Sequence, residues 1–389
     1  MVKRKTAAWC ILWLLLLFGL CSLCSALCVQ ADAAEKPSVS ASSAVLIEAK
    51  TGKVLYGLNE HERRSMASTT KIMSALLTLE AGELDTMFTV DSQAIHVEGS
   101  SMGLREGDQV SLRTLAYGML LASGNDAANA AAVAVAGSVE EFVDCMNERA
   151  DQVGMTNTHF VTPSGLDAEE HYSTAYDMAL LAREALQNAD FYTICSSEKV
   201  RLSYGNPAYN RWMTNHNKLL SLYEGAIGVK TGFTKKSGRC LVSAAQRNGV
   251  TLIAVTLNAP DDWNDHQKLF DYGFSKVENL PMKADLSGVR LPVVGGVTDT
   301  AMVAALQADT IIFDGNQQNI SQTILLEPFC YAPIDAGERV GCVQFWQDGI
   351  LIGQTDILAA QNVPYEEVTV KKTLWDQIKE FFTGLFRIQ

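Results

Sequence analysis

Strand-like segments lie at both ends of the first 275 residues, and a long helical stretch separates them. The segment 43–59, SAVLIEAKTGKVLYGLN, has two β-rich runs around a polar Lys-Thr-Gly and predicts a hairpin. Strand patterns return only after position 225, in AIGVKTGFT, RCLVSAAQRNG and VTLIAVTLNAP, where Asn248-Gly249 is a hairpin-turn signal. The pattern therefore predicts an α+β fold, an antiparallel sheet flanked by helices with a helical insert, rather than a βαβ repeat.

Helix signals fill the middle of the chain. The segment 65–82, SMASTTKIMSALLTLEAG, places its large apolar residues on one broad helical face. From 111 to about 189 helical patterns dominate, and Ser111, Asp126 and Thr174 are the expected N-terminal caps. We expect these helices to form one domain together with the sheet, over residues 34–275.

The composition changes near Lys276. Short strands punctuated by Gly, Pro and Asp follow, and they predict a small all-β domain, a β-sandwich, over 276–367. The last segment, 368–389, predicts an amphipathic helix. Its apolar face carries Leu374, Trp375, Ile378, Phe381, Phe382, Leu385 and Phe386. Large aromatic residues at a chain end are typical of a helix lying in a membrane interface, whereas the alternative is a helix packed on the β domain.

The first 33 residues predict a signal peptide. Three cations precede an apolar run, and Ala31-Asp32-Ala33 gives a small-x-small cleavage pattern. An uncleaved membrane anchor is the alternative, and the large residues before each candidate cysteine argue against a lipoprotein site. The sequence thus predicts an exported protein, located outside the cytoplasm and attached to the membrane through its C-terminal helix.

Charge and metal-ligand chemistry exclude several classes. The formal net charge of −13 and the absence of Lys/Arg blocks predict no nucleic-acid partner. The five cysteines beyond the signal segment are widely spaced without a C-x-x-C, so a disulfide framework is not indicated. The six histidines show no H-x-x-x-H pair, and we expect neither a metal nor another cofactor.

Two segments match S-x-x-K, and only one has a fitting context. Ser68 lies where a long apolar helix should begin, so Lys71 would follow one turn later on the same side. The positive end of that helix would also favour negative charge near Ser68. Ser196 and Lys199 lie in a polar, unpatterned stretch and are a chance match.

Two further motifs need the same test. S-x-N occurs at Ser123-Gly124-Asn125, where it could equally be a helix end closed by Gly124. G-x-S-x-G occurs at 99–103, but LREGDQV follows it and cannot start the helix that a hydrolase nucleophile elbow requires.

K-T-G occurs twice. The copy at 50–52 is the tip of the predicted hairpin, so its lysine should point into water. The copy at Lys230, Thr231 and Gly232 runs through Phe233 along a predicted strand, where a substrate peptide could lie against it. The second copy is the functional candidate.

The order S-x-x-K, S-x-N, K-T-G resembles the low-molecular-mass penicillin-binding proteins, the serine D-alanyl-D-alanine carboxypeptidases. The resemblance covers nearly the whole mature chain and includes MASTTKIMSALL, HFVTPSGLD and GVKTGFT. It implies a β-lactamase/DD-peptidase-like fold with a five-stranded sheet, and a helical insert that carries S-x-N.

The resemblance also implies roles for the motif residues. Ser68 would attack the carbonyl between two terminal D-alanines, with neutral Lys71 as base, once burial and the Lys230 cation lower its pKa. Backbone N–H groups of Ser68 and Phe233 would form the oxyanion hole. Ser123 would relay a proton to the leaving amine.

Substrate binding would fall to the remaining motif residues. Asn125 would hold the substrate amide, while Lys230 and Thr231 would bind the terminal carboxylate, with Gly232 leaving the strand open. Arg239 is a weaker candidate for the same carboxylate. The implied partners are the peptidoglycan stem pentapeptide, β-lactam antibiotics as inhibitors, and the outer face of the cytoplasmic membrane.

Three alternatives stay open at this point. A class A β-lactamase typically has aspartate inside S-D-N, where this chain has Gly124, and would have no need of the β domain. A transpeptidase would use the same residues with a different acyl acceptor. A cell-wall-binding protein without turnover would keep the fold alone.

Overall fold

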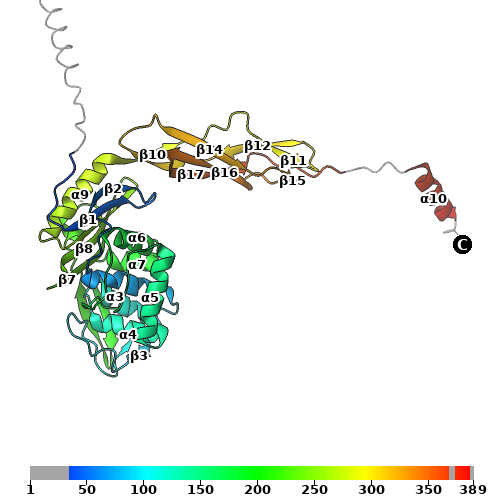
Figure 1. Cartoon of the computed structure of the whole chain (residues 1–389). Helices are drawn as coiled ribbons and strands as arrows, with labels where there is room; N and C mark the ends of the chain where they lie inside the picture. The colour runs from blue at the N-terminus through cyan, green and yellow to red at the C-terminus, as the bar shows by residue number, and fades with distance from the viewer. Residues whose placement is uncertain (1–34, 368–372, 386–389) are drawn as a thin grey trace, which may run out of the picture. The chain divides into compact units, whose positions relative to one another are not determined.

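The computed structural model describes residues 35–367 and 373–385 (Figure 1). The predicted signal segment 1–33 and both flanks of the C-terminal helix lie outside these residues. The chain divides into two compact units, the first ending at Lys276 and the second beginning at Val277.

The first unit contains a five-stranded antiparallel sheet in the order β2-β1-β9-β8-β7. Its strands are β1 (Ser43–Glu48), β2 (Val54–Leu58), β7 (Ala226–Thr234), β8 (Gly238–Arg247) and β9 (Val250–Leu257). Val45 of β1 lies opposite Val255 of β9, although the whole helical insert separates them in sequence. The expected α+β sheet built from both ends of this segment is confirmed.

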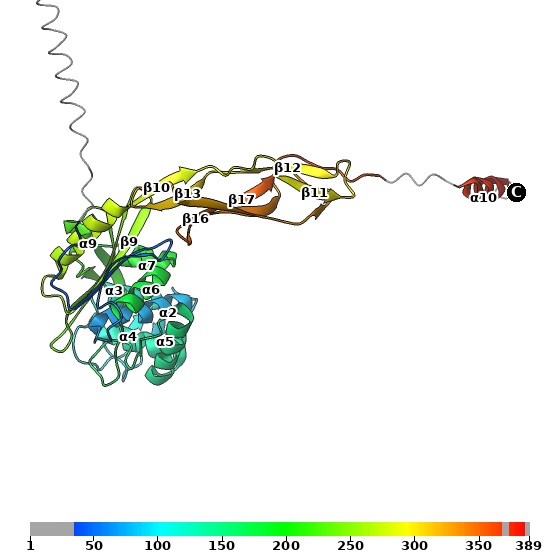
Figure 2. The ribbon, with the colours of Figure 1, turned by 45° about the horizontal axis from the view of Figure 1, so that its top comes forward.

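Helices cover both faces of this sheet (Figures 1 and 2). α9 (Asp262–Lys276) lies on one face, and α6 (Ala175–Ala185) lies on the other with the rest of the helical insert. His266 of α9 is fully buried between the hydroxyls of Ser243 and Thr256, and burial lowers its pKa to about 3. It is a neutral core residue rather than part of a site.

The helical insert is built around one buried helix. A short 3-10 turn, η1 (Ala67–Thr70), leads into α2 (Lys71–Glu80), whose residues from Lys71 to Leu76 are all buried. The other helices are α3 (Leu112–Leu120), α4 (Asn125–Ala136), α5 (Val139–Val153), α7 (Ala189–Cys195) and α8 (Leu219–Leu222). Two small strand pairs complete the unit: β3 (Phe88–Thr89) with β4 (Gln109–Val110), and β5 (Lys199–Gly205) with β6 (Ala208–Thr214).

The helix starts follow the sequence signals with one exception. Ser111 accepts a hydrogen bond from Thr114 N, and Thr174 accepts one from Asp177 N, as capping residues do. The expected cap at Asp126 is wrong by two positions, because α4 begins at Asn125 with Gly124 as its N-cap residue.

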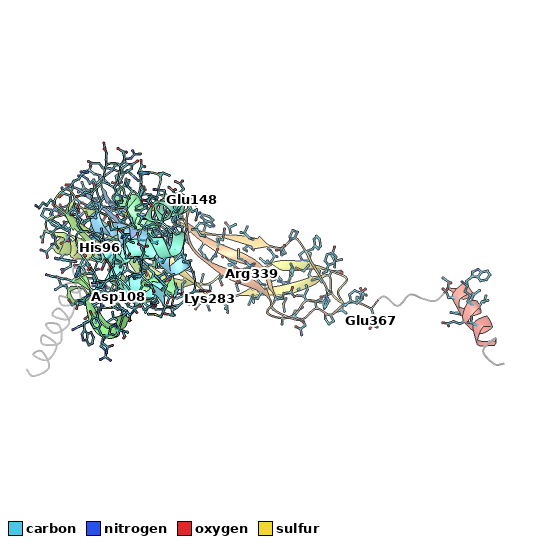
Figure 3. All side chains as sticks on the ribbon, turned by 90° about the horizontal axis from the view of Figure 1, so that it is seen from below. His96, Asp108, Glu148, Lys283, Arg339 and Glu367 are labelled. Atoms are coloured by element: carbon cyan, nitrogen blue, oxygen red, sulfur yellow. The ribbon has the colours of Figure 1, made fainter. Side chains whose placement is uncertain are left out.

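The part of the second unit from Val277 to Ala359 is all-β, as the composition predicted. A six-stranded sheet has the order β14-β16-β17-β12-β11-β15, and β10 pairs with β13 beside it. Its strands are β10 (Val277–Met282), β11 (Arg290–Val294), β12 (Thr300–Ala305), β13 (Ala308–Phe313), β14 (Ile320–Leu326), β15 (Cys330–Tyr331), β16 (Arg339–Gln347) and β17 (Ile350–Ala359). Alternate residues such as Val343 and Phe345 are buried. Arg339, labelled in Figure 3, lies on the surface of this unit and forms an ion pair with Asp356.

The last described element is the helix α10 (Leu374–Leu385). Thr373 precedes it and exchanges hydrogen bonds with Asp376, which closes its first turn. Leu374, Trp375 and Ile378 are exposed on it. Within the described residues, no helix combines the length and the apolar character needed to cross a bilayer.

Candidate active site

Ser68 and Lys71 lie side by side at the junction of η1 and α2. The Nζ atom of Lys71 is 3.0 Å from the Oγ atom of Ser68. The 3-10 geometry of η1 puts residues i and i+3 directly above each other, which brings these two side chains together. Ala67, just before the serine, has a φ of +48°, a left-handed conformation that a residue with a Cβ seldom adopts.

Lys71 is fully buried, and three oxygen atoms surround its amine. Besides Ser68, the Oδ1 atom of Asn125 lies at 2.7 Å and the carbonyl oxygen of Ser164 at 2.6 Å. Burial lowers the pKa of Lys71 well below its usual value, the Lys230 charge lowers it further, and Asp126 partly opposes both. The site therefore favours the neutral amine.

Ser123 and Lys230 form a second serine–lysine contact in the same site. Lys230 of β7 donates from Nζ to the Ser123 Oγ atom at 3.1 Å and to the carbonyl oxygen of Thr231 at 2.7 Å. Burial lowers the pKa of Lys230 to about 7. Ser123, not Gly124, takes the left-handed conformation after α3, with φ at +57°, so the alternative of a helix end closed by Gly124 is wrong.

Asn125, the first residue of α4, is fixed from both sides. Its Oδ1 accepts from Lys71, and its Nδ2 donates to the carbonyl oxygen of Glu98 at 2.6 Å. Gly99 makes this approach possible, because a Cβ there would lie 2.7 Å from Nδ2 of Asn125.

The G-x-S-x-G segment is a loop folded around a buried carboxylate. Asp126 accepts hydrogen bonds from Ser101 Oγ at 2.6 Å and from the backbone N–H groups of Met102, Gly103 and Leu104 at 2.9 to 3.1 Å. The segment is therefore a support for α4 and not a nucleophile elbow, in agreement with the sequence argument.

The second K-T-G copy lies against the nucleophile turn. A Cβ on Gly232 would lie 3.0 Å from Met66 O and 3.1 Å from Ser68 N, so a side chain there would push β7 away from η1. β7 is an edge strand of the sheet. Phe233 on it is 66% exposed and lines a cleft that opens at Ser68.

The first K-T-G copy closes the β1–β2 turn. Glu48 accepts hydrogen bonds from the N–H groups of Lys50 and Thr51 and from the Thr51 hydroxyl. Ser196 and Lys199 also lie in different elements, at the end of α7 and the start of β5. Neither the first K-T-G copy nor the second S-x-x-K match lines the cleft at Ser68. The sequence context had already ruled out both as parts of the site.

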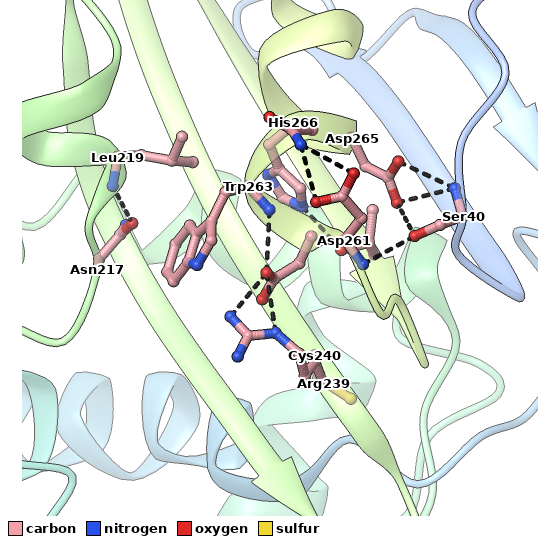
Figure 4. A network of polar contacts seen from close by, with 12 residues as sticks. Ser40, Asn217, Leu219, Arg239, Cys240, Asp261, Trp263, Asp265 and His266 are labelled. Atoms are coloured by element: carbon pink, nitrogen blue, oxygen red, sulfur yellow. Dashed lines mark hydrogen bonds and ion pairs between the residues drawn. The ribbon is translucent and has the colours of Figure 1, made fainter.

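A cleft of about 630 Å³ opens at Ser68. Its lining residues include Ser123, Thr231 and Gly232 from the motifs and Phe233 directly after them. Five more residues that belong to no motif also line it: Asn215, His216, Arg239, Asp262 and Trp263. Arg239 donates from Nε and Nη2 to Oδ1 of Asp262 at 3.0 and 2.7 Å, and its guanidinium carbon lies 5.4 Å from the Trp263 ring centre (Figure 4). Within the described residues no group of three His, Cys, Asp or Glu side chains could hold a metal ion.

The Ser164 carbonyl is a site group that motif reasoning missed. The HFVTPSGLD segment, which contains Ser164, supports the family resemblance, but the sequence assigns no catalytic or binding role to any of its residues. A backbone carbonyl leaves no signal in residue type. Gly165 is the one hint, since its φ of +79° and a Cβ position 2.0 Å from Ala67 O both require glycine.

Comparison with known proteins gives a consistent family. The D-alanyl-D-alanine carboxypeptidase profile (Peptidase S11) matches residues 30–261, and the profile of the penicillin-binding protein 5 C-terminal domain matches 283–365. The chain is 34% identical over 334 residues to D-alanyl-D-alanine carboxypeptidase DacF of Bacillus subtilis, covering 83% of this chain and 86% of that protein. It is also 34% identical to DacC of Escherichia coli, covering 90% and 91%.

Solved structures agree with this assignment. Penicillin-binding protein 5 from Haemophilus influenzae superposes with a TM-score of 0.65 at 28% identity, covering 85% of this chain and 99% of that one. The Streptomyces K15 DD-transpeptidase gives 0.59 at 34% identity, covering 62% and 99%. The chain thus belongs to the serine D-alanyl-D-alanine carboxypeptidases of the low-molecular-mass penicillin-binding protein family.

Proposed function

We propose that Ser68 is the nucleophile that removes the terminal D-alanine of a peptidoglycan pentapeptide, with Lys71 as its general base. The observation that carries this proposal is the 3.0 Å contact between Lys71 Nζ and Ser68 Oγ, in a cleft that Ser68 shares with Ser123, the hydrogen-bond partner of Lys230.

The hydrogen bonds of Lys71 suit a neutral amine. A neutral amine has two N–H donors and one lone pair. Two donors can go to Asn125 Oδ1 and Ser164 O, and the lone pair then faces the Ser68 hydroxyl, whose proton it accepts. Loss of that proton to Lys71 makes Ser68 reactive towards the D-alanyl carbonyl.

The oxyanion that forms would be held by the backbone N–H groups of Ser68 and Phe233. The close approach of β7 to η1 at Gly232 supports this pairing, because it brings the two backbones to the same end of the cleft. Losing one such donor costs about 10²–10³ in rate.

Ser123 and Lys230 serve the leaving group and the carboxylate. The Ser123 hydroxyl would pass a proton to the departing D-alanine amine and take one in turn from the Lys230 ammonium, whose Nζ lies 3.1 Å away. Burial lowers the pKa of Lys230 to about 7. Its charged form, together with the Thr231 hydroxyl, would bind the terminal carboxylate of the substrate. Asn125 orients the substrate amide, and water then hydrolyses the acyl-enzyme.

A direct test measures D-alanine release from a pentapeptide ending in D-Ala-D-Ala. We expect turnover by the wild type, none by Ser68→Ala, and a covalent β-lactam adduct on Ser68 by mass spectrometry. Addition of glycine as an acyl acceptor distinguishes the transpeptidase alternative, since transfer would yield a new peptide instead of the acid. A β-lactamase would instead release hydrolysed antibiotic rapidly. An adduct without turnover of the peptide would indicate a binding protein.

We propose that the protein is exported and attached peripherally to the membrane through α10. The exposed Leu374, Trp375 and Ile378 support this, since an apolar, aromatic stripe suits an interfacial helix. Flotation with phosphatidylglycerol vesicles should carry the wild type upward but not Trp375→Ser/Ile378→Ser. Leu306→Ser, which removes an exposed leucine of the β domain, is the matched control. N-terminal sequencing of the mature protein should begin at Ala34.

A further inference from the structure

His171 is a buried imidazole that connects the segment 161–171 to the turn that carries the nucleophile. It is 4% exposed. Its Nδ1 accepts a hydrogen bond from Val161 N at 2.9 Å, and its Nε2 lies 2.9 Å from the hydroxyl of Thr70. Thr70 stands between Ser68 and Lys71 in the S-x-x-K motif.

The partners of the ring fix its tautomer. Because the Val161 N–H is a donor, Nδ1 carries no proton, so Nε2 carries it and donates to Thr70. The Thr70 hydroxyl is then free to donate to the carbonyl oxygen of Ala67 at 2.8 Å. Only the neutral ring satisfies both contacts, since a protonated ring would set two N–H groups against each other.

This chain of hydrogen bonds ends on a residue of the nucleophile turn with a left-handed backbone. Ala67 has a left-handed φ of +48° and directly precedes Ser68. Its carbonyl also touches the 161–171 segment, because a Cβ at Gly165 would lie 2.0 Å from Ala67 O and 2.7 Å from Thr70 Oγ1. The conformation of the nucleophile turn and the position of this segment are therefore coupled.

The segment 161–171 also covers the amine of Lys71 and excludes water from it. Ser164 O accepts from Lys71 Nζ at 2.6 Å, and Pro163 O accepts from the Ser74 hydroxyl at 2.6 Å. Any retreat of the segment from η1 would remove the Ser164 acceptor and admit water beside Lys71. Water would favour the charged amine, which cannot act as a base.

We propose that His171 is a positioning residue of the acylation step, which holds the segment 161–171 against η1 and so keeps Lys71 dehydrated and directed at Ser68. This inference rests on the function proposed above and names a residue outside its three motifs. The ring acts through Thr70 and the backbone and does not touch the substrate.

The surroundings of His171 favour the neutral ring that this role requires. Burial lowers the pKa of His171 to about 4; His159 and Lys236 act in the same direction, and Asp167 opposes them. Phe160 packs against the ring with centroids 6.1 Å apart. The ring is therefore neutral at neutral pH, where both of its hydrogen bonds can form.

The test is the pH profile of acylation by a β-lactam in full-length variants. His171→Ala should acylate about 10²-fold more slowly, the order of loss that follows a misplacement of about 1 Å. The low-pH side of its pH–rate profile, the acid limb, should move to higher pH, because a more hydrated Lys71 has a higher pKa. His171→Gln offers an amide acceptor and donor and should restore most of the rate and the wild-type limb. His159→Gln, a nearby histidine exposed to solvent, is the control and should change neither.

Thr70→Val tests the contact from its other side. It should displace the acid limb in the same direction as His171→Ala, and combining it with His171→Gln should add little further loss. This variant decides the matter if His171→Ala does not fold, which thermal unfolding reports.

An unchanged acid limb in Thr70→Val and in any folded His171→Ala would overturn the inference, as would a failure of His171→Gln to recover the rate. Failure of the proposed function is distinguishable, because the wild type itself would then release no D-alanine.

Discussion

Replacing Lys230 by glutamine should stabilise the catalytic unit while destroying its activity. The native state holds this lysine 1% exposed, and burial lowers its pKa from 10.5 to about 7. A lysine with a lowered native pKa binds fewer protons in the folded than in the unfolded chain between those two values. The free energy of unfolding is therefore lowest below pH 7 and rises as the pH increases from 7 towards 10.5.

The size of the effect follows from the same values. A lowering of the pKa from 10.5 to about 7 corresponds to about 5 kcal/mol of unfolding free energy. The two hydrogen bonds from Lys230 to Ser123 and Thr231 offset about 3 kcal/mol of this. The variant should thus gain about 2 kcal/mol at neutral pH.

Urea unfolding of the full chain at pH 7 and pH 10 measures this gain. We expect Lys230→Gln to have the higher midpoint at pH 7 and the difference to shrink by pH 10. Lys50→Gln, at the exposed lysine of the other K-T-G, is the control and should change the midpoint at pH 7 by less than Lys230→Gln does. A variant less stable than the wild type at pH 7, or a difference that stays constant with pH, would refute the assignment of Lys230 as a costly buried cation.

Three further changes test the supports of the site. Gly165→Ala should lower the free energy of unfolding by about 2 kcal/mol or more, because its φ is +79° and the new Cβ would lie 2.0 Å from Ala67 O. Thermal unfolding measures this loss, and an unchanged midpoint would contradict the geometry. Asp126→Asn should move the acid limb of acylation to lower pH, because the carboxylate raises the pKa of Lys71; a shift to higher pH would reverse the sign of that interaction. Phe233→Ala should leave acylation within about threefold, whereas Phe233→Pro should lower it about 10²–10³-fold, because only the N–H is used; equal losses would assign the role to the side chain.

The sequence predicted the parts of the fold that local chemistry decides. Asn248 and Gly249 both take the positive φ of a tight hairpin turn, and Thr174 caps α6 as its hydroxyl suggests. The choice between the two K-T-G copies also followed from context. Ser68, Ser123, Thr231 and Gly232 line one cleft, and the buried Lys71, Asn125 and Lys230 are hydrogen-bonded to its serines or to each other. Their chemical roles stay predictions.

What escaped the sequence depends on paths that distant backbone segments take. The Ser164 carbonyl reaches Lys71 only because Gly165 packs against Ala67, and no pattern in residue type records such a contact. The left-handed residue after α3 is Ser123 and not its glycine neighbour, because Ser123 must turn its hydroxyl towards Lys230. Local turn statistics favour glycine there, and the requirements of the site override them.

The pairing of β1 with β9 places the first and last strands of the catalytic unit at the centre of its sheet. The sheet cannot close until the segment up to position 257 is free to fold, so every earlier folding intermediate lacks the framework on which η1 and β7 meet. Covalent labelling by penicillin should then count finished molecules and ignore partly folded ones. The rate at which newly made protein becomes able to bind a radiolabelled penicillin would therefore measure the rate at which its catalytic unit folds.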